Sequence, residues 1–433
     1  MLIIKRKLLD YHCPSLGRQV THYALIAQLP KKKLLLSHPN LFLYDTTRSS
    51  EKTSSRYSSV ISMFYKFLST EEKFKDLDPS QYHAVVDNLD LKRWQLARQI
   101  ARVAKQSLKP TSETIFEDAK IVLVFCHWLN LKGYRTNVKV EIKTHTANFK
   151  RNSLLAYVQA KARTSIRAKN IQALDKEARQ RQRRTLITAS EIKTYLQAFT
   201  DPVYSVMFKL ALGTAMRPMD LCTVPYLGNG ANAHIMPYSE MDQEPTLFNF
   251  TVYGSKGNKT RTIKIHRDDL RVLDEQYIQP YYDERRKKYK KRFGEDCPLD
   301  ILFLNAQGLP VTPEKISSRG NAAKDKAVAK DKTFRASLNF YESRHWWPTM
   351  FLISYFKEDL LTSSADVLWA ACGEALVQQM GHEDVSTTFA HYIDMGRVVM
   401  MANKGKMTEL ITQAHSSVHS FIDTVTTGNL ILD

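Results

Sequence analysis

The sequence has few cysteines, and none of them are paired in a motif. Its five cysteines, at positions 13, 126, 222, 297 and 372, lie far apart, with no CxxC pair and no cysteine–histidine spacing suited to zinc. Isolated thiols of this kind argue against a disulfide framework and are typical of a reducing compartment. No uninterrupted apolar stretch reaches membrane-spanning length, and the apolar run after Met1 is too short and too broken by charge for a signal peptide. These absences predict a soluble cytoplasmic protein, or a nuclear one in a eukaryote.

The sequence also lacks the motifs of nucleotide-dependent and metal-dependent catalysis. It contains no Walker loop and no cluster of carboxylates that could form a two-metal site. It has no internal repeat and no low-complexity block. We therefore expect no cofactor and no metal.

Positive charge is what the chain has in excess. Over 433 residues, 63 Lys and Arg against 44 Asp and Glu leave a formal net charge of +19 and a pI near 9.5. Such a surplus favours a polyanionic partner, because each cation that meets a phosphate releases condensed counterions. Hydrophobic residues make up 43% and charged residues 25%, which is the range of folded globular proteins. The length allows two or three domains, and nucleic acid is the leading candidate for the partner.

The amino-terminal part of the chain changes character twice. Residues 1–50 mix proline, serine and charge without a sustained period, and we expect an arm or extension there. Residues 51–160 show helical periodicity, with a basic helix face at 89–108, and predict a small helical domain. Residues 161–184 carry nine basic and two acidic side chains and few apolar ones. We interpret them as a basic linker that could lie along a duplex.

A second domain is expected over residues 185–395. Thr188 or Ser190 can cap its first helix, and a strongly apolar helix then reaches a turn at Gly213 and Thr214. Two alternating strands around a Gly-Asn turn predict a hairpin over 246–266, followed by a long basic helix and further helices. Residues 396–433 form a tail whose apolar helix face packs within the chain by default. The residues of that face are Val398, Met400, Met401, Met407, Leu410 and Ile411. The expected fold class is mixed, mainly α with a small antiparallel sheet.

Four stretches of this second domain hold residues suited to chemistry. Arg217 follows an apolar helix and could form an ion pair with Asp220, three residues on. Lys256 lies near a hairpin tip, where a lysine is usually solvated, and Arg344 precedes a deeply apolar helix that it could cap. His382 and Tyr392 could be ordinary semi-buried residues. Taken one at a time, these residues are explained by packing or solvation.

Their order along the chain points to another interpretation. The stretches "GTAMRPMDL", "GSKGNKTR", "YESRHWWPTMF" and "MGHEDVSTTFAHY" are similar, in that order, to the "TGxRxxEL", "GKGxKxR", "HxLRHTFAT" and "LGHxxxxTTxxxY" boxes of the tyrosine recombinase (phage integrase) family. The sequence resembles this family well over about residues 184–395 and more loosely over the helical domain before it. The resemblance implies a two-domain DNA clamp, with a helical core-binding domain and an α+β catalytic domain.

The resemblance also implies a role for each matching residue. Two arginines would grip the non-bridging oxygens of the scissile phosphate, where a planar forked donor suits two oxygens. The attacking phenol has a pKa of about 10 and needs a strongly positive site, while the leaving oxygen needs an acid. The implied assignments are Arg217 and Arg344 as phosphate ligands, Lys256 as general acid, His382 as a phosphate hydrogen-bond donor, Tyr392 as nucleophile and Asp220 as support for Arg217.

One position departs from the family pattern. Tyr341 stands three residues before Arg344, where the family has histidine or sometimes lysine. A tyrosine can donate a hydrogen bond to the phosphate but is a poor proton acceptor at neutral pH. Either His345 or His391 could compensate. Tyr341 is also a rival nucleophile, although the threonines that precede Tyr392 in the matching box favour Tyr392.

The expected function is that of a site-specific DNA recombinase or integrase of a mobile genetic element. It would cleave and rejoin double-stranded DNA through a covalent 3′-phosphotyrosine, which conserves the bond energy and needs no nucleotide cofactor. The resemblance implies four protomers on two paired sites, with accessory DNA-bending factors as possible partners. It also implies that the tail at 396–433 could dock on a neighbouring protomer. Two alternatives stay open: an inactive architectural DNA-binding protein on the same fold, and a type IB topoisomerase-like enzyme.

Overall fold

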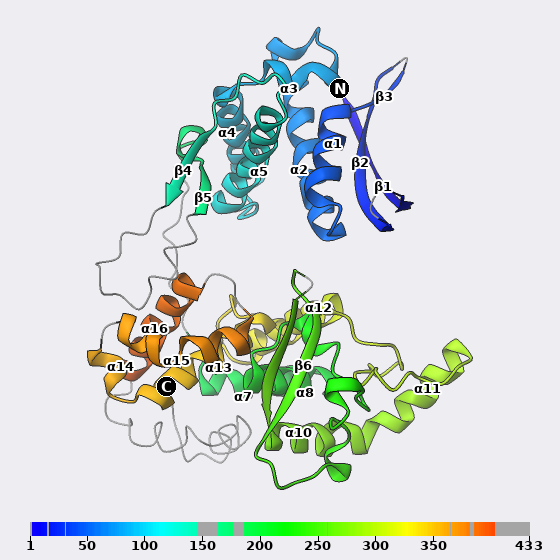
Figure 1. Ribbon diagram of the computed structural model, residues 1–433, viewed down its shortest axis with the longest axis vertical. Coiled ribbons are helices and arrows are strands. Elements are labelled where there is room, and N and C mark those ends of the chain that lie inside the picture. Colours follow the sequence, from blue (N-terminus) through cyan, green and yellow to red (C-terminus); the bar gives the residue numbers. More distant parts are fainter. Residues whose placement is uncertain are drawn as a thin grey trace. The chain divides into compact units, whose positions relative to one another are not determined.

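The chain folds into two compact units, each with its own apolar core. A computed structural model describes residues 2–14, 17–30, 32–145, 163–175, 186–257, 259–363, 365–381 and 385–402 (Figure 1). Contacts divide the chain at residues 182 and 183, so that the first unit is Met1–Gln182 and the second Arg183–Asp433. Within the described ranges the fold is mainly helical with small antiparallel sheets, as the sequence predicts.

The first unit begins with a sheet where the sequence indicates an extended arm. β1 (Ile3–Cys13) pairs along its whole length with β2 (Arg18–Gln28), and β3 (Lys33–Leu35) pairs with the end of β2. Asn40 of α1 (Ser37–Thr47) ties the helix to the sheet, because its side-chain amide accepts from Leu25 N at 2.6 Å and donates to Leu25 O at 3.0 Å. Most of β1 is exposed, so its sequence lacks the apolar alternation that marks a half-buried strand.

Helices make up most of the remainder of the first unit. Its other elements are α2 (Glu51–Leu68), η1 (Glu72–Phe74), η2 (Pro79–Gln81), α3 (Tyr82–Val85), α4 (Asn88–Ala104), α5 (Ser112–Leu131), β4 (Glu141–His145), β5 (Arg163–Arg167) and η3 (Lys169–Ile171). The side chain of Thr111 caps α5 by accepting from Thr114 N, and the chain leaves that helix through Gly133 at φ +75°. The long helices α2, α4 and α5 pack on one another and on a common core.

The first half of the expected linker is part of this unit. β5 pairs antiparallel with β4, and Ile171 is completely buried in the core. Arg102 also reaches forward to Asp175, with Nη2 at 3.2 Å from Oδ1. The polar composition of 161–184 predicts a tether because β5 is short and, among the apolar side chains described at 166–175, Ile171 alone is fully buried. Residues 176–185 lie outside the described part of the chain.

The second unit is built around α8 (Pro202–Thr214), which packs against helices on several sides and against β7. Its first helix, α7 (Ala189–Ala198), starts as expected at Thr188, whose side chain and that of Glu191 cap each other's backbone N–H. The expected hairpin is present as β6 (Leu247–Ser255) and β7 (Lys259–His266), with an irregular register between Val252 and Ser255. Between α8 and the hairpin lie α9 (Pro218–Leu221), η4 (Gly230–Asn232) and η5 (Tyr238–Glu240).

After the hairpin the second unit is helical. The long basic helix is formed by α10 (Arg267–Leu273), the π-helical segment η6 (Asp274–Tyr282) and α11 (Asp283–Phe293), which succeed one another without a break. The later elements are α12 (Pro313–Lys330), η7 (Phe340–Glu342), α13 (Ser343–Phe356), α14 (Asp359–Thr362), α15 (Ala365–Met380) and α16 (Val385–Ala402). α13 packs on both α8 and α16, and a separate apolar cluster joins α13 to α16.

The carboxyl-terminal tail is described only at its start. Within α16, Met400 is buried, whereas Val398 and Met401 are exposed. The rest of the expected apolar face, at Met407, Leu410 and Ile411, lies outside the described residues. None of the described helices is long and apolar enough to cross a bilayer. All five cysteines are thiols without a disulfide.

Candidate active site

Arg217 is placed by the abrupt end of α8. Ala215 adopts a left-handed conformation (φ 55°, ψ 25°), and Pro218 opens α9, so the chain turns sharply and Arg217 occupies the N-cap of α9. The guanidinium then points into a polar cluster. Its Nη1 donates to Ser255 Oγ at 3.1 Å and its Nη2 donates to Gly381 O at 3.0 Å. Both acceptors are electrically neutral.

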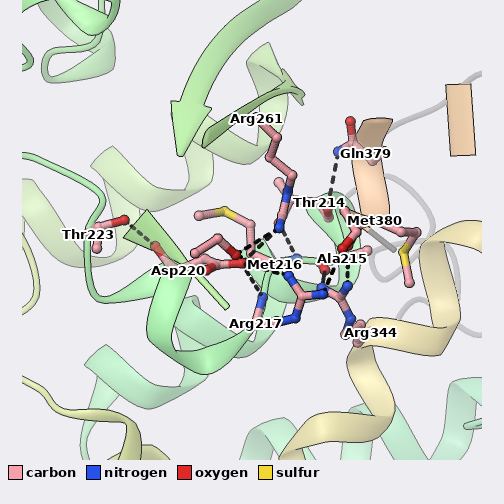
Figure 2. A network of polar contacts seen from close by, with 12 residues as sticks. Thr214, Ala215, Met216, Arg217, Asp220, Thr223, Arg261, Arg344, Gln379 and Met380 are labelled. Atoms are coloured by element: carbon pink, nitrogen blue, oxygen red, sulfur yellow. Dashed lines mark hydrogen bonds and ion pairs between the residues drawn. The ribbon is translucent and has the colours of Figure 1, made fainter. Parts of the chain in front are cut away.

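Arg344 enters the same cluster from the first turn of α13, as Figure 2 shows. It is 1% exposed and donates through Nη1 to Ala215 O and through Nη2 to Met380 O. Burial and the neighbouring Arg217 charge lower the pKa of Arg344 to about 10. The guanidinium is therefore charged at neutral pH, although water no longer solvates most of it.

A third arginine, Arg261 of β7, completes the cluster. Its Nη2 donates to Asp220 Oδ2 at 2.8 Å, and its Nη1 donates to Ser255 Oγ at 3.0 Å. Burial lowers the pKa of Arg261, and the Asp220 charge opposes that shift. The sequence interpretation missed this residue, although it closes the "GSKGNKTR" stretch that drew attention to Lys256. An arginine at the end of that box was the available signal.

Asp220 binds Arg261 more closely than Arg217. The sequence predicts that Asp220 supports Arg217, and it does accept from the backbone N of Arg217 at 3.3 Å. The side chains are farther apart, with Arg217 Nη1 at 3.7 Å from Asp220 Oδ2, against 2.8 Å for Arg261 Nη2. Among the described residues of the cluster, Arg217 and Arg261 share one carboxylate, and the third guanidinium, that of Arg344, donates to backbone carbonyls. The site keeps a surplus of positive charge and is suited to an anion.

The end of α15 closes over these arginines. Gly381 has φ +60°, and a Cβ on it would lie 2.5 Å from Arg261 Nη1, so a side chain there would strain the backbone and displace Arg261. The side chain of Gln379 donates to Thr214 O and Lys264 O, each at 3.0 Å, and accepts from Lys264 N at 2.9 Å. This one amide joins the ends of α8 and α15 to β7. It fixes the backbone carbonyls that the arginines use.

A tyrosine–histidine pair lies beside the arginines. Tyr392 of α16 is 2% exposed, and its hydroxyl is 3.1 Å from His345 Nδ1. Tyr341 is 43% exposed, and its ring meets the His345 ring edge-on with centroids 6.1 Å apart. Both phenols lie near enough to Arg344 for their ionised forms to raise its pKa. His345 therefore stands between the two candidate nucleophiles, next to the positive cluster.

Two of the predicted residues are not in the cluster as described. Lys256 directly follows Ser255 but is exposed at the tip of the hairpin. His382 lies outside the described residues, as does the side chain of His391. The structure brings together the remaining predicted residues: Arg217, Asp220, Tyr341, Arg344, His345 and Tyr392. Across the residues that the structure describes, no group of three or more His, Cys, Asp or Glu side chains could hold a metal ion.

Comparisons with known proteins give structural likenesses only. No protein-family model matches the chain, and no curated protein matches its sequence. The chain is similar to a crystal structure of a lambda integrase dimer bound to a COC′ core site, at 16% identity and a TM-score of 0.42. That match covers 83% of this chain and 95% of the other.

Two further solved structures are similar over comparable lengths. One is the XerH site-specific recombinase bound to a palindromic difH substrate, at 14% identity, 82% and 80% coverage and a TM-score of 0.46. The other is the Tn1549 transposon integrase in complex with transposon right-end DNA, at 13% identity, 85% and 99% coverage and a TM-score of 0.45. The likeness covers most of this chain in each case. At such identities and scores it assigns neither an activity nor a residue.

Proposed function

We propose that the protein is a site-specific DNA recombinase or integrase that cleaves and rejoins DNA through a tyrosine. The observation that carries the proposal is the cluster of Arg217, Arg261, Arg344 and Asp220, with the Tyr392 hydroxyl and His345 beside it. A surplus of buried guanidinium charge is costly to a fold unless an anion neutralises it. A phenol next to such a site is placed to attack a phosphodiester.

The arginines would bind the phosphate by exchanging acceptors. Arg217 donates to a hydroxyl and to a carbonyl in this structure, and two phosphate oxygens would replace these neutral acceptors with charged ones. In the transition state the equatorial oxygens carry extra negative charge. Fixed guanidinium groups stabilise that charge more than they stabilise the ground state.

The covalent step would use the tyrosine–histidine pair. Tyr392 Oη attacks the phosphorus, the bond from phosphorus to the 5′ oxygen breaks, and a 3′-phosphotyrosine forms. His345 Nδ1 takes the phenol proton in the tautomer in which Nε2 carries the ring hydrogen. Lys256, on the exposed tip of the hairpin, gives a proton to the leaving 5′ oxygen. Reversal of these transfers with another 5′ hydroxyl rejoins a strand, so protons and bonds balance without a cofactor.

The wider assignment is supported by charge and by the sequence boxes. A net charge of +19 suits a duplex partner, and the second unit carries all four boxes. We propose a helical core-binding domain in the first unit, a catalytic domain in the second, and four protomers acting on two sites of a mobile element. Tyr341 then sits at the position of a family histidine and donates a hydrogen bond to the phosphate rather than accepting a proton.

The decisive test is a covalent adduct that depends on one tyrosine. Purified protein is incubated with a pool of nicked duplexes of randomised sequence, denatured in SDS, and the DNA that remains attached is sequenced. We expect an adduct with the wild-type protein and with Tyr341→Phe, and none with Tyr392→Phe. The exposed Tyr355 provides a matched control, since Tyr355→Phe leaves the adduct unchanged.

Other outcomes would identify the alternatives. DNA binding without an adduct anywhere in the pool would support an architectural protein. If Tyr392→Phe still forms the adduct and Tyr341→Phe does not, Tyr341 is the nucleophile. Relaxation of a supercoiled plasmid that lacks the recovered sequence would favour a topoisomerase-like enzyme.

A further inference from the structure

We propose that Arg261 is a positioning residue that takes up the charge of Asp220 and thereby leaves the Arg217 guanidinium to the substrate phosphate. The inference rests on the proposed function and adds a residue that acts through Arg217 rather than on the phosphate. Figure 2 shows the two arginines approaching the same carboxylate from different elements, Arg217 from the start of α9 and Arg261 from β7.

The two arginines lie at unequal distances from Asp220. Asp220 Oδ2 is 2.8 Å from Arg261 Nη2 and 3.7 Å from Arg217 Nη1, so only the contact with Arg261 is a hydrogen bond. Ser255 Oγ lies almost equally far from both guanidiniums, at 3.0 Å from Arg261 and 3.1 Å from Arg217. Arg261 therefore holds the charged acceptor, and Arg217 shares only a neutral one.

Burial makes Asp220 dependent on this contact. The Asp220 side chain is completely buried and that of Arg261 is 8% exposed, so the carboxylate relies on protein groups for its stabilisation. Asp220 Oδ1 and Arg261 Nε have no hydrogen-bond partner among the described residues. A carboxylate with one oxygen unsatisfied would turn to another cation if its present one were removed. Arg217, already 3.7 Å away, is that cation.

Arg261 is packed against Gly381, and its two terminal nitrogens donate to Asp220 and Ser255. Gly381 covers it so closely that a Cβ at position 381 would lie 2.5 Å from Nη1 and 2.8 Å from Cδ. Arg217 instead donates to the Gly381 carbonyl from its other nitrogen. The hairpin arginine is thus packed beneath the end of α15, while Arg217 keeps two exchangeable acceptors.

Loss of the Arg261 charge would redirect Asp220. The carboxylate would close the gap to Arg217, and a phosphate would then have to compete with it for the same guanidinium. Cleavage would slow, whereas binding of the duplex, which depends on many phosphate contacts, would change little. Removing the Asp220 charge as well would release Arg217 again.

The test is a double-mutant cycle on single-turnover cleavage of the nicked duplex recovered with the wild-type protein. We expect Arg261→Gln to lower the cleavage rate about 100-fold, the size of losing one fixed transition-state donor. Duplex affinity, measured separately, would change by less than about threefold because most phosphate contacts remain. The double variant, Arg261→Gln with Asp220→Asn, is expected to cleave at least about tenfold faster than Arg261→Gln alone, because the effects of substitutions within one network are not additive.

Arg261→Lys adds an intermediate variant. A lysine keeps the charge but cannot bridge Asp220 and Ser255 with a rigid fork, so we expect about a tenfold loss of rate. Thermal unfolding of every variant separates misfolding from loss of rate. If Arg261→Gln does not fold, Arg261→Lys with and without Asp220→Asn provides the same comparison.

The outcomes separate this inference from the proposed function. A double variant as slow as Arg261→Gln alone would show that Arg261 only holds the hairpin in place, and would overturn the inference. Wild-type cleavage rates in Arg261→Gln would overturn it too, while leaving the proposed function intact. Absence of any adduct with the wild-type protein would overturn the proposed function and this inference together.

Discussion

Buried charge is paired in the first unit but unbalanced in the arginine cluster of the second unit. In the first unit each of three buried ionic groups has opposite charge close by: Arg102 meets Asp175, Asp90 meets Lys73 at 2.9 Å, and Asp118 meets Arg98 at 2.9 Å. In the cluster of the second unit, Arg217 and Arg261 share Asp220, and Arg344 donates to backbone carbonyls. Balanced pairs of the first kind are typical of structural residues. An excess of buried positive charge is instead stabilised when an anionic ligand binds. The imbalance, more than the burial of any one arginine, marks the candidate site.

The largest effect on adduct formation is expected from substitution of Arg344. Arg344→Gln removes the guanidinium that is held by the carbonyls of Ala215 and Met380, so we expect adduct formation to fall by about 10³-fold, an upper value for one electrostatic donor. The measurement is the initial rate of adduct formation on the recovered duplex. Arg98→Gln, which breaks a balanced pair of the first unit, is the control and should keep more than about a tenth of the rate, because a paired fold arginine donates nothing in the transition state. Equal losses in both variants would remove the distinction between the units.

The second prediction compares stability in the two units. Arg102→Ala leaves Asp175 buried without its main partner and is expected to cost about 3–5 kcal/mol of unfolding free energy. Arg217→Ala relieves repulsion from the neighbouring arginines, so its cost should stay below about 1 kcal/mol or become a small gain, as is common where function and stability conflict. Denaturant unfolding, followed for each unit, measures both. A cost above about 3 kcal/mol for Arg217→Ala would contradict a ligand-directed cluster.

The third prediction concerns pH, where the units respond with opposite sign. Hydrogen bonds from Ser80 and from Lys32 lower the pKa of Asp78, in the first unit, to about 2, so its contribution to stability is lost as pH falls through that value. Burial raises the pKa of Asp269, in the second unit, from 3.8 to about 8. The folded chain then keeps a proton that the unfolded chain releases, and the contribution of Asp269 falls as pH rises from about 4 to about 8.

Asp269→Asn should therefore flatten the pH dependence of the second unit. The expected change across that window is on the order of a few kcal/mol, because one pKa unit corresponds to about 1.4 kcal/mol. Melting temperatures of the wild-type protein and the variant at about pH 5, 6.5 and 8 span the window and provide the measurement. The charged Asp268 next to it is a suitable control, since Asp268→Asn should leave most of the slope in place. If the melting temperatures of wild type and Asp269→Asn change with pH in parallel, the raised pKa of Asp269 is not the source of the pH dependence.

Helices and their caps could be predicted because their signals are local. Thr188 with Glu191 and Thr111 before α5 are predicted by capping preferences alone, and the β6–β7 hairpin is predicted by strand alternation around a glycine turn. The sheet at the amino terminus could not be found in this way. β1 is exposed at most positions, and its partner is recognisable only through the burial of Leu25 and Ala27 in a core made by later helices.

The site was predictable in its residue types but not in its pairings. The four boxes indicated Arg217, Arg344 and Tyr392, because each box is a short pattern with fixed spacing. Asp220 pairs more closely with Arg261, which lies on a β-strand 41 residues further along the chain. The i, i+3 spacing of a helix predicts a pair with Arg217 instead. The raised pKa of Asp269 depends on burial by distant elements and has no sequence signature.

The conformation of Ala215 has a consequence for how rigidly the arginine cluster is held. A left-handed backbone costs a residue with a Cβ about 1–2 kcal/mol, and glycine would avoid that penalty. The alanine methyl group, however, is fully enclosed in the same apolar cluster as Leu352 and Ile353. This packing restricts rotation of the peptide plane, so the Ala215 oxygen that accepts from Arg344 keeps its direction in the absence of a ligand. The strained backbone of Ala215 thereby orients the Arg344 guanidinium.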